Sequence, residues 1–206
     1  MMRRAGGLVV LLALMPAQPS LADDYPFTGD FAIAGDPAAP GPSDLYRCAL
    51  SFFRQGADGK FTGYHADLAG FSAGDPPRYV IYQSGTCVHD AGAGIESCTL
   101  TFETDRELEG RTFVDVISSI AKDHVKTLSF ESLAEAQAHS TTGQSDNAFP
   151  ITYVRCPFDG ARLAAALSSS ASTVSAGERN QLTSPDDGFL AQKSVHDLAK
   201  AMGLIP

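Results

Sequence analysis

The sequence predicts an α+β domain in which an antiparallel sheet of four or five strands packs against C-terminal helices. Three observations indicate this class. Runs rich in β-branched and aromatic residues, separated by glycine-containing turns, fill the first half of the chain. Apolar residues at helical spacing follow residue 110. No regular alternation of strands and helices is visible, so a parallel sheet is not expected.

Two hairpins and one late strand make up the expected sheet. The first hairpin turns at Asp58 and Gly59, a pair suited to the positive φ of a tight turn. The turn of the second hairpin contains Gly92 and Gly94, and Pro150 places the last strand at a sheet edge or at its own start. The expected strands are residues 45–55, 61–69, 78–88, 95–104 and 149–156.

A helix is expected from Thr112 onward, because Asp115 follows this potential N-cap at the spacing of a capping box. Its apolar stripe consists of Phe113, Val116, Ile117, Ile120, Val125 and Leu128. Three shorter helices are expected to begin near Ser132, after Asp159 and after Ser184. The chain is therefore expected to end in helices that cover one face of the sheet.

Residues 1–22 have the pattern of a Sec-type signal peptide. Arg3 and Arg4 precede a short apolar run, and Ala22 ends a small-residue cleavage pattern. We expect cleavage after Ala22 and a periplasmic or extracellular location. Residues 23–44 form a Pro/Gly-rich arm, and residues 45–206 form the single α+β domain.

Export makes the four cysteines interpretable, because an even number in an oxidising compartment predicts disulfides. The second expected hairpin places Cys87 opposite Cys98, which leaves Cys48 to pair with Cys156. No CxxC motif is present, so no metal site is expected.

The charge pattern excludes some classes of partner. A formal net charge of −9 disfavours nucleic acid, and it equally disfavours an anionic membrane surface once the signal is cleaved. No phosphate-binding or dinucleotide motif occurs, so no cofactor is expected. The acidic run from Glu103 to Glu109 is either a cation site or, as we prefer, a solvated loop.

Two positions are candidates for general-base chemistry. His65 and Asp67 are two residues apart on an expected strand, so they share one face as an oriented base or as part of a solvated polar surface. His124 lies near the centre of the expected helical stripe, where it is either a core residue or the wall of a pocket.

The preferred function is that of an exported, non-enzymatic binding or interaction protein whose ligand is a protein or a small molecule. Candidate ligand contacts are the aromatic residues Tyr64, Tyr79 and Tyr82. The alternative is a small secreted hydrolase that uses His65 with Asp67, or His124, as general base beside a serine such as Ser84.

Overall fold

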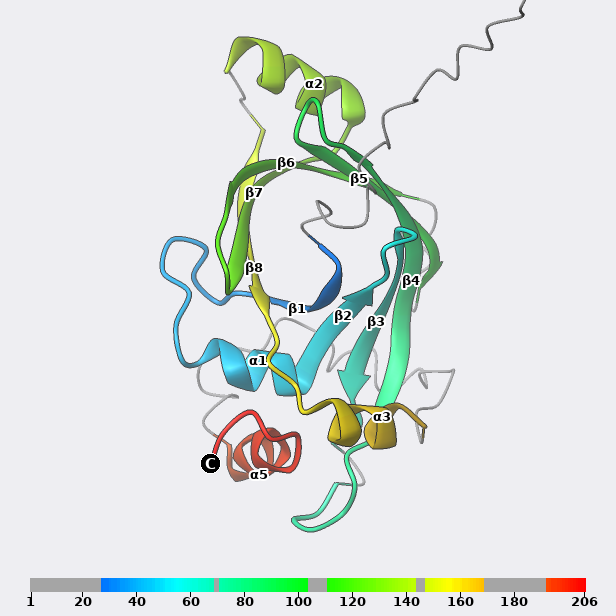
Figure 1. The fold of residues 1–206 in the computed structure, drawn as a ribbon, viewed down its shortest axis with the longest axis vertical. Coiled ribbons are helices and arrows are strands. Elements are labelled where there is room, and N and C mark those ends of the chain that lie inside the picture. Colours follow the sequence, from blue (N-terminus) through cyan, green and yellow to red (C-terminus); the bar gives the residue numbers. More distant parts are fainter. Residues whose placement is uncertain (1–26, 69–70, 104–110, 144–146, 169–191) are drawn as a thin grey trace, which may run out of the picture.

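The computed structural model describes residues 27–68, 71–103, 111–143, 147–168 and 192–206. These residues form a closed antiparallel barrel of eight strands, in which each strand pairs with the next one along the chain and β8 pairs with β1. Figure 1 shows the barrel nearly end-on, with the described helices on its outside.

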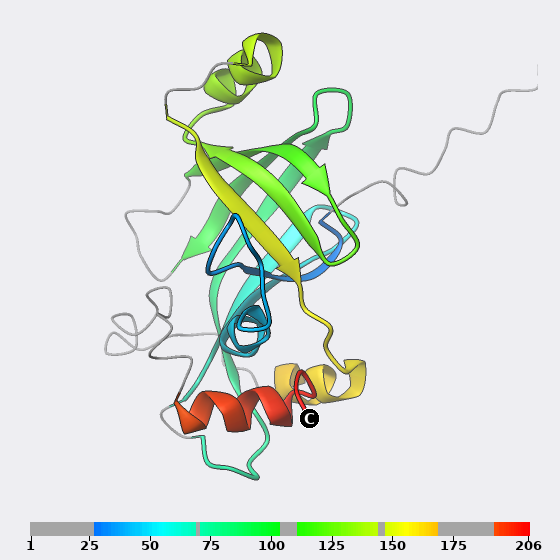
Figure 2. The same cartoon turned by 90° about the vertical axis from the view of Figure 1, so that its left-hand side faces the viewer.

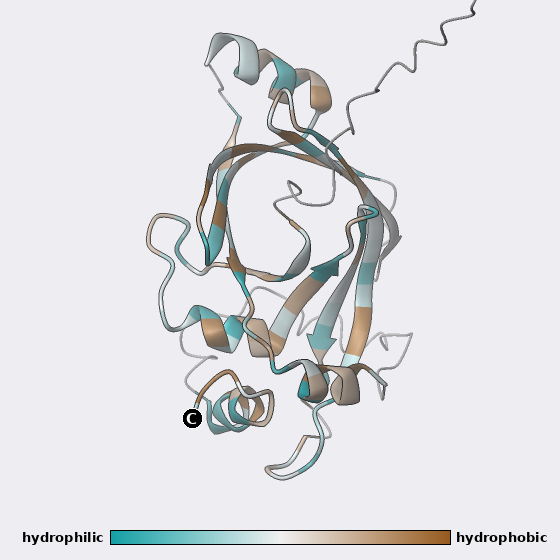
Figure 3. Cartoon of the chain, viewed as in Figure 1, coloured by the Kyte–Doolittle hydropathy of each residue, from teal (hydrophilic) through white to brown (hydrophobic). Residues whose placement is uncertain are grey.

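The strands of the barrel are β1 Gly29–Ile33, β2 Ser51–Gln55, β3 Lys60–Ala66, β4 Tyr79–Asp90, β5 Ile95–Glu103, β6 Thr112–Ile120, β7 His124–Phe130 and β8 Phe149–Arg155. The described helices are α1 Asp44–Leu50, α2 Leu133–Thr142, α3 Gly160–Ser168 and α5 Lys193–Ala201. Both hydrophobic and hydrophilic residues occur along the barrel strands (Figure 3).

The predicted fold class is wrong, because the chain forms a closed barrel rather than a four- or five-stranded sheet covered by helices. The expected N-terminal arm contributes β1, which pairs with both β2 and β8 and closes the ring. The expected strand at residues 45–55 divides into α1 and β2. The expected helix from Thr112 to Leu128 is the hairpin of β6 and β7.

The helical stripe was misleading because both faces of this hairpin are covered. Val114 and Val116 point outward and pack beneath Ala136 of α2, whereas Ile117 and Val125 point inward and pack with Phe27. A strand buried on both faces loses the strict alternation of apolar and polar residues, so apolar residues also occur at helical spacing. The many β-branched residues of this segment do favour strand.

The first predicted hairpin turn is present between β2 and β3. Gly59 has φ +77°, and a Cβ placed there would lie 2.2 Å from the carbonyl oxygen of Cys87. The amide of Cys87 in turn donates to the carbonyl of Gly59 at 2.8 Å. This turn therefore requires glycine, both for its backbone conformation and for the close approach of β4.

Helices cover two opposite sides of the barrel (Figures 1 and 2). Helix α2 packs on the outer face of β5, β6 and β7 through Ala136. Helices α1, α3 and α5 enclose the largest apolar cluster, whose most buried members include Phe52, Leu163, Val195 and Leu198. The outer barrel surface is thus partly core, and the interior is left to a separate set of side chains.

The two predicted disulfides are confirmed. Cys48 of α1 is bonded to Cys156, which follows β8, and so ties the helix to the barrel. Cys87 and Cys98 are direct partners across β4 and β5 and point into the barrel. Disulfides of this kind are consistent with an exported protein. The expected signal peptide lies outside the described residues.

Among the described residues, no helix combines the length and the apolar character needed to cross a membrane.

Candidate functional site

The barrel interior contains a cavity of about 270 Å³. Its wall is mainly apolar and aromatic, with a small number of polar side chains. The described residues that line it are Phe27, Ile33, Phe53, Gln55, Phe61, Tyr82, Gln83, Cys87, Glu96, Cys98, Phe113, Asp115, Ser129, Ile151 and Tyr153. Small-molecule sites commonly combine such walls with a few polar groups.

One side of the cavity is formed by aromatic rings that meet edge to face. The Phe27 ring lies 5.2 Å from that of Tyr153, and the Phe53 ring lies 5.5 Å from it, both nearly perpendicular. Phe27 precedes β1 and is only 2% exposed. The chain leading into β1 therefore places a ring inside the barrel and fills part of its interior.

Two hydrophobic residues mark the opening of the cavity to solvent. Ile33 at the end of β1 is 53% exposed, and Phe113 near the start of β6 is 40% exposed. Both also line the cavity. A molecule entering here would pass an apolar rim before it reached the polar groups of the wall.

Four polar residues form a continuous row across neighbouring strands. The register pairs His89 with Glu96, Glu96 with Asp115, and Asp115 with Ser129. Glu96, Asp115 and Ser129 line the cavity. Because directly paired residues of adjacent strands project to the same face, β4 to β7 bring these groups together inside the barrel.

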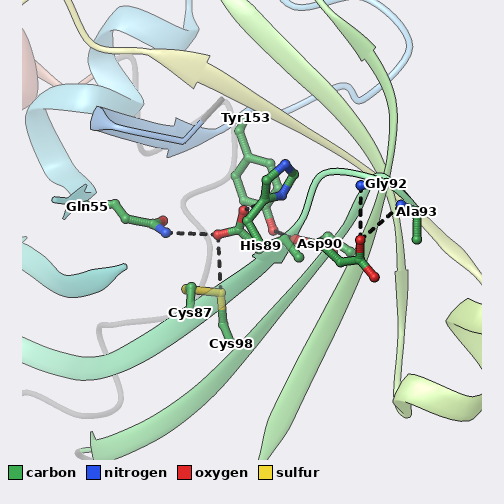
Figure 4. A network of polar contacts seen from close by, with 10 residues as sticks. Gln55, Cys87, His89, Asp90, Gly92, Ala93, Cys98 and Tyr153 are labelled. Atoms are coloured by element: carbon green, nitrogen blue, oxygen red, sulfur yellow. Dashed lines mark hydrogen bonds and ion pairs between the residues drawn. A yellow bond between two sulfur atoms is a disulfide. The ribbon is translucent and has the colours of Figure 1, made fainter. Parts of the chain in front are cut away.

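Glu96 is almost completely buried, at 2% exposed. Its Oε1 accepts a hydrogen bond of 2.8 Å from Nε2 of Gln55 in β2. The same oxygen lies 3.6 Å from Sγ of Cys98, which has no proton to donate because it is bonded to Cys87. Figure 4 shows Gln55, His89, Tyr153 and this disulfide converging on one region of the barrel.

Asp115 is the second buried carboxyl group, at 8% exposed. The hydroxyl of Tyr153 donates to its Oδ2 at 2.7 Å, whereas Oδ1 has no hydrogen-bond partner among the described residues. Burial raises the pKa of Asp115, and the nearby hydroxyls of Tyr153, Ser129 and Thr127 oppose this shift only in part. Burial and the nearby Asp115 carboxyl raise the pKa of Tyr153, which therefore stays protonated as a donor.

His89 stands at the end of the polar row. Its Nδ1 lies 3.9 Å from Oε2 of Glu96, and its side chain is 12% exposed. Burial lowers the pKa of His89, although the neighbouring Asp90 opposes the shift. At neutral pH the imidazole is therefore uncharged and does not neutralise Glu96.

The cysteines of this region do not form a metal site in the oxidised protein. Ligand atoms of Cys87, Glu96 and Cys98 lie within 4.8 Å of one another. However, the two sulfur atoms are bonded to each other, and a disulfide does not supply the thiolates that bind zinc.

The three candidate tyrosines occupy different environments. Tyr82 lines the cavity, and its ring lies 4.6 Å from that of His65. Tyr79 is fully buried beneath the helices, where its hydroxyl donates to the carbonyl of Ala49. Tyr64 stacks on Phe52 within the same apolar cluster. Only Tyr82 is therefore in a position to contact a molecule inside the barrel.

The candidate bases lie on two strands that are not neighbours in the barrel. His65 is in β3, with Nδ1 3.3 Å from the carbonyl oxygen of Leu50, and Asp67 follows the end of that strand. His124 begins β7 and contacts Asp123, its neighbour in sequence, at 2.9 Å. The acidic run expected near Glu103 falls mainly on residues 104–110, outside the described part of the chain.

Sequence reasoning missed the residues that define the cavity, namely Gln55, Glu96 and Asp115. A detectable signal was present, because Glu96 and Cys98 are two residues apart and must share a strand face. The cysteine pairing across the hairpin places Glu96 on the same face as the disulfide, and closure of the barrel makes this face the inner one. Asp115 was hidden by its assignment as a helix-capping residue.

No protein-family model matches this chain, and no curated protein matches it. The class that the structure defines is an eight-stranded antiparallel barrel with a partly polar internal cavity.

Proposed function

We propose that the protein is an exported binding protein that holds one small molecule inside its barrel. The observation that carries this proposal is the cavity of about 270 Å³ with aromatic walls and two buried carboxyl groups. Eight-stranded barrels are wide enough either to be filled by side chains or to hold one small ligand. In this barrel the inward-facing side chains leave a cavity that a small molecule could occupy.

The size of the cavity limits the ligand. An engineered apolar cavity of about 150 Å³ in another protein holds a benzene molecule. The interior of this barrel is larger, at about 270 Å³, yet smaller than most sites for drug-sized molecules. We therefore expect a ligand of about ten non-hydrogen atoms, with an apolar body that contacts the aromatic wall.

The expected periplasmic or extracellular location supports the same role. The pattern of residues 1–22 favours secretion, and the two disulfides suit an oxidising compartment. We expect that the protein recovered from the exported fraction begins at Asp23. Amino-terminal sequencing tests this, and a protein that keeps residues 1–22 in the cytosol contradicts it.

Saturation-transfer NMR with small aromatic probes tests barrel binding. Toluene, indole and 2-phenylethanol are each mixed with the mature protein with its disulfides intact. We expect at least one probe to bind, and we expect binding to be lost in the cavity-filling variants Ser129→Phe and Ile151→Phe. Thr86→Phe is the control, because Thr86 is exposed on the outside of β4.

Two results would contradict the proposal: no probe binds, or binding persists unchanged in both cavity-filling variants. Two variants are used because overpacking can prevent folding. Circular dichroism and a count of free thiols establish that each variant is folded and oxidised before it is compared.

A further inference from the structure

Glu96 and Asp115 are direct partners across β5 and β6, and both line the same cavity. Two carboxyl groups placed directly opposite each other repel when both are ionised. Burial increases this repulsion, because the protein interior screens charge less than water does. The pair is therefore unfavourable in the empty barrel unless a proton or a cation neutralises it.

No lysine or arginine lies among the described residues that line the cavity. Arg155 of β8 lies 4.7 Å over the ring of Phe31 and donates to the carbonyl of Thr28, and it is not among the residues that line the cavity. The only basic group in the polar row is His89, which is uncharged at neutral pH. The described lining of the cavity thus offers an incoming molecule two carboxyl groups and no lysine or arginine side chain.

The aromatic wall is also suited to a cation. Tyr153 donates its hydroxyl to Asp115 and presents its ring beside those of Phe27 and Phe53. The faces of such rings attract an ammonium group, and this attraction is strongest where water is excluded. Rings and carboxyl groups therefore favour the same kind of ligand at the same place.

We infer that the ligand is a small organic amine whose ammonium group is received by Asp115 and Glu96 and whose apolar body lies among the aromatic rings. This inference rests on the proposed function and narrows it to one class of ligand. Oδ1 of Asp115 lacks a hydrogen-bond partner among the described residues, so it is an acceptor that an N–H group satisfies. Primary and secondary amines are therefore favoured over quaternary ammonium compounds.

The position of Asp115 relative to the cavity opening and the net charge of the protein both agree with an amine ligand. Asp115 is one inward position deeper than Phe113 at the opening, a distance of about 7 Å along the strand. An amine would thus place its charge inside and leave its body near the apolar rim. The formal net charge of −9 also attracts cations during the encounter.

Isothermal titration calorimetry with three analogues of similar size tests the inference. 2-Phenylethylamine is a cation at pH 7, 2-phenylethanol is neutral, and 3-phenylpropanoate is an anion. We expect the amine to bind at least tenfold more tightly than the alcohol and the anion not to bind detectably. The N,N,N-trimethylated amine should bind more weakly than the primary amine, because it has no N–H to donate.

Variants of the two carboxyl groups test whether these groups cause the preference for the amine. Asp115→Asn and Glu96→Gln should each weaken binding of 2-phenylethylamine by about tenfold or more and change binding of 2-phenylethanol by less than about twofold. Asp75→Asn is the matched control, because Asp75 is exposed in the connection before β4. Asp115→Asn keeps an acceptor for the hydroxyl of Tyr153, so we expect this variant to fold. It therefore still tests the inference if Glu96→Gln proves unstable.

The outcomes separate this inference from the proposed function. If the alcohol binds as tightly as the amine, the amine inference is overturned and the barrel remains a binding site. If the amine is preferred but both carboxyl variants bind it normally, the assignment to Asp115 and Glu96 is overturned. If none of the analogues binds, the inference fails, and toluene and indole decide the broader proposal.

Discussion

Glu96 lies directly opposite Asp115 on adjacent strands, and both side chains face the interior of the barrel. A structure that needed only a stable core would place apolar residues at these positions, since buried carboxyl groups lose their hydration. We therefore expect the pair, when both groups are ionised, to lower the stability of the ligand-free protein. Its consequences for stability and for ligand binding can be measured separately.

Asp115→Asn is expected to stabilise the empty protein at pH 7. The folded-state pKa of Asp115 lies above its unfolded value because of burial. The stability associated with protonated Asp115 is therefore fully present below the unfolded pKa. The free energy of unfolding then falls as pH rises through the folded pKa, because the buried carboxyl group becomes ionised. We therefore expect Asp115→Asn to raise the free energy of unfolding at pH 7.

Urea unfolding of Asp115→Asn and of the unmodified protein, at pH 7 and at pH 3, measures this gain. The gain should largely vanish at pH 3, because the Asp115 carboxyl group of the unmodified protein is then mostly protonated in both the folded and the unfolded state. Asp75→Asn should change stability little at either pH. A variant that is less stable than the unmodified protein at pH 7 would show that ionised Asp115 has a favourable structural role.

Gly59→Ala is expected to destabilise the protein more than Gly143→Ala does. The two glycines have similar backbone angles, with φ +77° and +71°, but only Gly59 leaves no room for a Cβ. Alanine at Gly143 should cost about 1 kcal/mol for its backbone conformation alone. Alanine at Gly59 should cost at least about 2 kcal/mol more, because β4 must move. Equal costs in denaturant unfolding would contradict the close contact with Cys87.

Loss of the Cys48–Cys156 disulfide is expected to destabilise the protein more than loss of Cys87–Cys98. The first joins residues 108 apart and the second joins residues 11 apart. In the chain-entropy model these loops correspond to about 5 and about 3 kcal/mol. Urea unfolding of the two paired Cys→Ala variants tests the order, and a larger loss for the short loop would argue for a role of that disulfide in shaping the cavity.

Phe27→Ala is expected to destabilise the protein by about 3 kcal/mol or more and to enlarge the cavity. Phe27 is 2% exposed and packs edge to face against Tyr153. Phe149→Ala is the control, because Phe149 is 59% exposed and its loss should cost less than about 0.5 kcal/mol. Binding of a larger aromatic probe by Phe27→Ala alone would show that this ring limits the size of the ligand. If Phe27→Ala is as stable as the control, Phe27 does not fill the barrel interior.

The residues themselves predicted the local features of this protein. Asp58 and Gly59 predicted the first hairpin, and the second hairpin brought Cys87 opposite Cys98. Ser132 and Asp159 marked the starts of α2 and α3, where their side chains accept hydrogen bonds from the first amides of the helix. These features depend on interactions over a few residues, or on one turn, and are therefore visible in sequence.

Only the tertiary structure decided the closed barrel and its cavity. The short strand Gly29–Ile33 has no strong strand signal of its own and is defined by its pairing with both β2 and β8. The hairpin of β6 and β7 is apolar on both faces because α2 covers one and the barrel encloses the other. Closure is a long-range event, and it alone places Glu96 and Asp115 together inside a cavity, since no local pattern tells which face of a strand will be enclosed.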